Sequence, residues 1–176
     1  MRYASFGRMI GFAGFLAVVG LGALALRGNA DEPRRVNADA GADAVERTRD
    51  QVKMLDDLYK NAVVSITAIY DGPPAIKVAK QVFGAMEKKG WHKARLVDVT
   101  GAPLNEANEP KTEFEKRAAE AIKAGKPYYD EVAGEGAERR LLAATIVPAV
   151  MKKCATCHGA KEGDLLGFIS YDVPVK

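Results

Sequence analysis

The pentapeptide CATCH at residues 154–158 restricts the fold and the chemistry of this chain more than any other segment. On a helical turn, residues three and four apart lie on one face, so Cys154, Cys157 and His158 can point in the same direction. The spacing C-x-x-C-H is that of covalent haem attachment, in which each thiol forms a thioether with a vinyl group and the histidine binds the iron. We therefore expect one covalent haem c, with His158 as proximal iron ligand, on a helix that ends at Gly159.

Three other uses of two neighbouring cysteines fit the sequence less well. A disulfide between Cys154 and Cys157 would have to close within one helical turn, which gives poor bridge geometry. A thioredoxin-like dithiol needs its first cysteine at a helix N-terminus, whereas we expect this helix to begin near Pro148. A zinc site needs a fourth ligand, and the only other histidine, His92, lacks the usual paired spacing.

The first thirty residues have the pattern of an export sequence. Arg2 and Arg8 precede an uncharged apolar stretch from Met9 to Leu26, and small residues follow it. Because these 18 apolar residues are just long enough to span a thin bilayer, residues 1–30 are expected to be a signal peptide or an N-terminal membrane anchor. The positive flank keeps the N-terminus in the cytoplasm and sends the rest across. We expect a periplasmic protein, soluble or tethered by residues 9–26.

The charge of the exported part is balanced. The chain has 26 basic and 23 acidic side chains, and three arginines lie in the export segment, which leaves 23 of each sign. This balance argues against nucleic-acid binding, which needs a concentrated cationic face. Both cysteines belong to the CATCH motif, so no disulfide framework is expected. The remaining residues, about 145, suit one compact domain.

A long helix is expected in the first part of the exported chain. Residues 31–44 are small and polar and include Pro33 and Gly41, which predicts a linker. Apolar residues then recur at alternating steps of three and four from Val45 to Ile69, until segment 71–74 (DGPP) ends the pattern. We expect this seam to pack on its own domain. A homodimer through the same helix is the alternative, because the repeat lasts about four heptads.

The remaining residues alternate between helices and strands. The sequence predicts a helix over 74–90, a strand over 94–99, a helix over 110–123, a hairpin of strands 128–132 and 140–147, the motif helix and a last strand over 165–173. This order implies an α+β domain over residues 45–176, with an antiparallel sheet of about four strands and helices packed on one side. The other face of such a sheet can be exposed or covered by the long first helix.

Two common cytochrome folds agree less well with this order. In small soluble cytochromes c the haem motif opens the domain and a downstream methionine completes the iron coordination, but no methionine follows Met151. The four-helix cytochrome c′ carries its motif near the C-terminus. However, segments 94–99 (ARLVDV) and 165–173 (LLGFISYDV) are crowded with β-branched and aromatic residues and predict strands. A cytochrome c′-like gas-binding bundle is therefore only an alternative.

The chain resembles the family of single-haem, c-type, PAS-like periplasmic domains over roughly residues 55–176. The resemblance is carried by the order of five segments: LYKNAVVSIT, KKGWHKARLVDVTGAPLNEANEP, FEKRAAEAIKAGKPYYDEV, RRLLAATIVPAVMKKCATCHG and LLGFISYDVPVK. It implies a PAS-like sheet, a haem between this sheet and the N-terminal helices, and a role in redox or gas sensing. Some members take the other iron ligand from an N-terminal cysteine, and this chain has no third cysteine.

The distal iron ligand is therefore open. His92 is the only histidine outside the motif, and imidazole binds iron well, but it would more often be a solvent-facing side chain at the end of a helix. Met54 lies on the long helix, off the apolar seam, and its alternative is a core or dimer contact. A vacant or water-occupied position is the third option.

Two functions follow from these options. A filled distal position favours electron transfer, and an open one favours binding of a diatomic gas. The first hypothesis is a sensor of redox state or gas that signals through a separate partner protein. The second is a monohaem electron carrier that exchanges electrons with redox partners. No distal acid–base pair is recognisable, so peroxidase or nitrite chemistry ranks third and we do not expect an enzyme.

Overall fold

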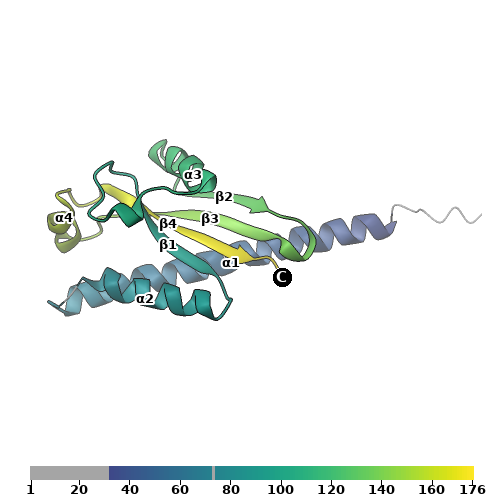
Figure 1. The fold of residues 1–176 in the computed structure, drawn as a ribbon, viewed down its shortest axis with the longest axis horizontal. Coiled ribbons are helices and arrows are strands. Elements are labelled where there is room, and N and C mark those ends of the chain that lie inside the picture. Colours follow the sequence, from purple (N-terminus) through teal and green to yellow (C-terminus); the bar gives the residue numbers. More distant parts are fainter. Residues whose placement is uncertain (1–31, 73) are drawn as a thin grey trace, which may run out of the picture.

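The computed structural model describes residues 32–72 and 74–176, and the export segment lies outside this range. Within the described part, no helix is both long enough and apolar enough to cross a membrane. The described residues form four α-helices, four strands and two short 3-10 helices (Figure 1): α1 (Glu32–Ile69), α2 (Ala75–Lys88), β1 (Lys93–Asp98), η1 (Glu106–Asn108), α3 (Glu113–Lys123), β2 (Tyr128–Ala133), η2 (Gly136–Glu138), β3 (Arg140–Pro148), α4 (Lys152–His158) and β4 (Leu165–Pro174).

The four strands form one antiparallel sheet in the order β1-β4-β3-β2. Strands β2 and β3 form the predicted hairpin, and α4 lies in the connection between β3 and β4, which are neighbours in the sheet. The connection from β1 to β2 carries η1 and α3 from one edge of the sheet to the other. The α+β fold with a four-stranded antiparallel sheet, predicted from the sequence, is confirmed.

Helices cover both faces of the sheet, so of the two arrangements that the sequence left open, the one in which the long first helix covers the second face is observed. Helices α1 and α2 cover one face, and α3 covers the other (Figure 1). The residues of β3 from Leu141 to Pro148 are apolar except Thr145, and such a strand is typical of a sheet that is buried on both faces. On the α1 side, the buried sheet residues are Leu141, Ala143, Ile169, Tyr171 and Val173; on the α3 side they are Val97, Ala144 and Phe168.

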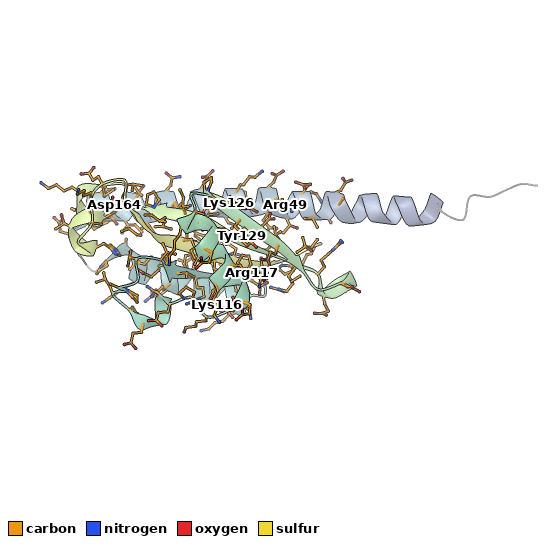
Figure 2. The ribbon with its side chains drawn as sticks, turned by 90° about the horizontal axis from the view of Figure 1, so that it is seen from above. Arg49, Lys116, Arg117, Lys126, Tyr129 and Asp164 are labelled. Carbon is orange, nitrogen blue, oxygen red and sulfur yellow. The ribbon has the colours of Figure 1, made fainter. Side chains whose placement is uncertain are left out.

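Strand β2 shows the same two-sided arrangement in its charged residues. Asp130 accepts a hydrogen bond from Nε of Arg49 on α1 at 2.7 Å. The next residue, Glu131, points to the opposite face because side chains alternate along a strand, and it accepts two hydrogen bonds from Arg117 on α3. Figure 2 shows Arg49 on the long helix and Arg117 on α3. Each helix is thus tied to the β2 edge by an arginine.

Helix α1 begins at Glu32, so the predicted linker over residues 31–44 is wrong from that residue onward. Alanine occupies four positions of this segment and has the highest helix propensity, and Pro33 falls in the first turn, where a missing N–H costs little. Ala44 is buried against the core. A Cβ at Gly41 would lie 3.1 Å from Nη1 of Arg139, so this glycine leaves room for the guanidinium group.

The apolar seam of α1 packs on its own domain, as predicted, up to Tyr59. Its first members are buried in the core below α1, and its last member, Ile69, is 72% exposed. A homodimer through α1 stays a prediction. The buried members of the seam are Val45, Thr48, Val52, Leu55 and Tyr59.

Candidate functional site

Helix α4 carries all three residues of the CATCH motif that were singled out from the sequence. Gly159 ends this helix in the left-handed conformation, with φ of 63°, as the sequence predicted. The helix begins at Lys152 rather than near Pro148, because Pro148 is the last residue of β3. Cys154 therefore lies in the first turn, and its position on the helix does not by itself exclude a reactive dithiol.

The underside of α4 is anchored to the sheet. Ala155 is 6% exposed and packs with Ala149 and Leu166, and Cys154 lies partly buried against the same group. Two backbone hydrogen bonds of 2.9 Å, from Ala149 N to Asp164 O and from Gly163 N to Ala149 O, close the loop around the helix. The motif thus lies on a supported helix at one end of the sheet (Figure 1).

The outer side of α4 presents Cys157 and His158 to solvent. Both cysteines are free thiols, and Cys157 and His158 are exposed. In the described part of the chain, His, Cys, Asp and Glu side chains form no group of three or more that could hold a bare metal ion. Two thiols and one imidazole on a single helix can instead bind a haem covalently and supply one axial ligand.

Lys153 joins the motif helix to the end of α1. Its Nζ donates a hydrogen bond to the carbonyl oxygen of Thr67 at 3.1 Å and another to Oδ1 of Asp71 at 2.7 Å. The ammonium group lowers the pKa of the Asp71 carboxyl through this hydrogen bond and through its charge. The sequence carries no signal for this contact, because more than 80 residues separate the partners in the chain.

His92 does not lie at the motif. It is 2% exposed, and its Nε2 lies 2.9 Å from the phenol oxygen of Tyr59. The adjacent residue Lys93 pairs with Asp172 on β4. Asp172 lies seven residues after Leu165, where β4 begins beside α4, and this separation corresponds to roughly 23 Å at the usual rise of a strand. The structure therefore does not bring His92 and His158 of one chain together.

Met54 is also distant from the motif. Its side chain is 63% exposed on α1, thirteen residues before Thr67, the residue that contacts Lys153. This separation corresponds to roughly 20 Å along a helix. Neither candidate distal ligand is thus placed opposite His158 in the described structure.

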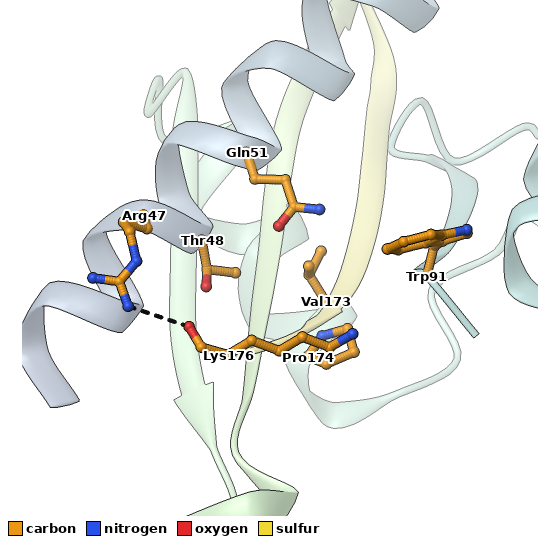
Figure 3. A pocket seen from close by; sticks show the side chains of 7 residues that line it. All are labelled: Arg47, Thr48, Gln51, Trp91, Val173, Pro174 and Lys176. Carbon is orange, nitrogen blue, oxygen red and sulfur yellow. Dashed lines mark hydrogen bonds between the residues drawn. The ribbon is translucent and has the colours of Figure 1, made fainter. Parts of the chain in front are cut away.

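A separate cavity of about 230 Å³ lies on the α1 side of the sheet, near the end of β4 (Figure 3). Its cationic groups already have partners: Nη2 of Arg47 donates to the carbonyl oxygen of Lys176 at 3.4 Å, and Nζ of Lys176 lies 5.5 Å from the centre of the Trp91 ring. No cysteine or histidine lines this cavity, which is formed by Arg47, Thr48, Gln51, Trp91, Val173, Pro174 and Lys176.

Comparison with known proteins places this geometry in a family. The crystal structure of the cyanobacterial heme-protein Tll0287 is similar to this chain, with a TM-score of 0.51 and 16% sequence identity. The similarity covers 74% of this chain and 94% of that chain, and at this identity it shows the fold. No curated protein matches the chain. A family model described as Tll0287-like matches residues 27–174, most of the chain, which confirms the family resemblance found in the sequence. The chain therefore belongs to the Tll0287-like family.

Proposed function

We propose that this protein binds one haem c covalently through Cys154 and Cys157, with His158 as an axial iron ligand. The observation that carries the proposal is the placement of two free thiols and an exposed imidazole on one anchored helix. The similar solved structure is that of a protein described as a heme-protein, which supports the same cofactor here. A bound haem would supply an iron centre that takes up one electron or an external ligand.

The surface next to α4 suits a large apolar group. Ile69 is 72% exposed and Tyr70 66% exposed, and both directly precede Asp71, which contacts Lys153. Val150, just before α4, is 52% exposed. Single exposed apolar side chains are ordinary, but several beside one motif are typical of a ligand surface.

We infer that the protein acts in redox or diatomic-gas sensing through a separate partner. Among the described residues, His92 and Met54 both lie far from the motif, which supports an iron whose sixth position stays available to an external ligand. Residues 1–30, which lie outside the described part, support export to the periplasm, where the protein would be soluble or tethered.

An electron carrier is the second candidate function. The exposure of Cys157 and His158 favours it, because a haem attached there would present an edge to solvent and to a partner. A filled sixth position on the iron favours electron transfer, so this function would also call for a second iron ligand that is not among the described residues in contact with α4.

The covalent proposal is tested by producing the chain together with a c-type haem maturation system and weighing the intact product. We expect the mass of one added haem, which resists extraction by acidic acetone. The double variant C154A/C157A should carry no covalent haem, and T156A, which changes one of the two residues between the cysteines, should carry it normally. A wild-type mass equal to the bare polypeptide would refute the proposal.

Ligand binding separates the two candidate functions. The reduced holoprotein should change its absorption spectrum on addition of carbon monoxide if it senses a gas. An unchanged low-spin spectrum would favour the electron carrier and contradict the gas sensor.

A further inference from the structure

Helix α1 ends beside α4, and Lys153 donates a hydrogen bond to one of the last carbonyl groups of α1. The last four carbonyls of a helix have no partner within the helix, and Thr67 lies within this last turn of α1. No basic residue stands in the last turn of α1 itself. Lys153 therefore supplies, from another helix, the positive charge that stabilises a helix C-terminus.

We propose that Lys153 is a positioning residue that holds the motif helix against the end of α1 and so sets how far the haem is shielded from water. The proposal rests on the proposed haem attachment. Lys153 directly precedes Cys154 and lies one helical turn before Cys157, so its side chain and that of Cys157 share a face of α4.

The apolar residues of the α1 end explain why this contact matters. Ile69 and Tyr70 lie between Thr67 and Asp71, the two partners of Lys153. When Lys153 holds both partners, these apolar side chains are kept beside the motif. When the contact is lost, water gains access to the haem side of α4, and because water stabilises the charged ferric state, the reduction potential falls.

A simple charge effect is the competing explanation. Lys153 and Asp71 are largely exposed, with side-chain exposures of 49% and 93%, and exposed ion pairs contribute little by themselves. The two explanations give opposite signs for one substitution. Replacing Asp71 by alanine removes a negative charge, which alone would raise the potential, but it also removes the acceptor of the Lys153 hydrogen bond, which lowers the potential if the contact shields the haem.

The experiment measures the reduction potential of the holoprotein with and without these substitutions. We expect K153A and D71A both to lower the potential and K153R to keep it near the wild-type value. K152A is the matched control, because it removes the same charge from the adjacent exposed residue of α4, which makes no hydrogen bond or ion pair within the described structure. It should lower the potential less than K153A. A raised or unchanged potential in D71A would overturn the proposal.

Hydrogen exchange of the α4 amides gives a second measurement on the same samples. Exchange over residues 152–160 should be faster in K153A and D71A than in the wild type, K153R or K152A. Equal exchange in all five proteins would overturn the proposal. Because the mass of the product reports haem attachment separately, a chain without haem refutes the proposed function, while exchange still decides whether Lys153 holds α4.

Discussion

The phenol oxygen of Tyr59 and Nε2 of His92 lie 2.9 Å apart, and both residues are buried, at 7% and 2% exposure. Burial lowers the pKa of the imidazole and raises that of the phenol, so both groups are favoured in their neutral forms. The ring of Tyr59 also contacts Phe83 edge-on, with centroids 4.9 Å apart. The pair therefore links α1, α2 and the start of β1, which is a structural role.

The first prediction is that His92→Ala destabilises the fold without altering the iron. The substitution leaves the Tyr59 hydroxyl buried without a partner, and such a loss costs about 1–3 kcal/mol of unfolding free energy. Urea unfolding measures this loss, and the spectrum of the holoprotein should not change. Met54→Ala, at an exposed side chain, is the control for stability. A changed iron spectrum in His92→Ala would show that His92 binds the iron.

The second prediction concerns acid sensitivity. Burial holds the pKa of His92 below its ordinary value of 6.5, so the unfolded chain binds the proton more readily than the folded chain. The stability that depends on neutral His92 is therefore complete above about pH 6.5 and is lost as the pH falls toward the lower pKa of the folded state. Melting temperatures measured between pH 7.5 and 5 should decrease. His92→Gln should have a flatter profile, and parallel profiles would contradict this role.

The parts of the fold that rest on local patterns could be predicted from the sequence. The hairpin of β2 and β3 follows from a glycine-rich turn between two strand-like runs, and α3 follows from the apolar spacing of Phe114, Ala118 and Ile122. The start of α1 was missed, because a proline and a glycine outweighed four alanines in the sequence pattern. The sequence pattern left open whether the second face is covered, although β3, which is apolar from Leu141 to Pro148 except at Thr145, favours a sheet covered on both faces.

The candidate site also has residues whose placement follows from local sequence patterns and residues whose placement does not. Cys154, Cys157 and His158 share one helix because their spacing is local, so their placement could be predicted. The positions of His92 and Met54 relative to α4 depend on the strand register and on the length of α1, which the sequence pattern does not specify. The contact between Lys153 on α4 and Asp71, just after α1, joins residues that are far apart in the chain, and no sequence pattern indicates it.

The third prediction is that Gly167→Ala weakens the pairing of β1 and β4. A Cβ at Gly167 would lie 2.1 Å from the carbonyl oxygen of Val97, a distance that no side chain can adopt, so the backbone of one strand must shift. Overpacking of this kind costs about 1–3 kcal/mol. The matched control is Gly84→Ala on α2, where a Cβ meets nothing within 4 Å and alanine should stabilise by about 0.5–1 kcal/mol. Urea unfolding should shift the two variants in opposite directions; a shift in the same direction would contradict the close approach.

The fourth prediction concerns Glu115, which is 2% exposed at the start of α3. Burial alone would raise its pKa, but hydrogen bonds from the backbone of Lys111, from Arg95 and from the backbone of Thr112 outweigh this effect and lower it. Glu115→Gln keeps the shape and removes the charge, so it should cost about 1.5–3 kcal/mol at neutral pH, the range for hydrogen bonds to a charged group.

The pH dependence of this loss gives the sharper test. Because the folded pKa of Glu115 is lowered, its contribution is complete above the ordinary value of 4.5 and is lost as the pH falls below it. The difference in stability between wild type and Glu115→Gln should therefore shrink below about pH 4.5. Glu113→Gln, an exposed acid in the same helical turn, is the control and should change stability little. Equal losses in both variants would show that the buried carboxylate at the start of α3 does not hold the helix to Arg95 on β1.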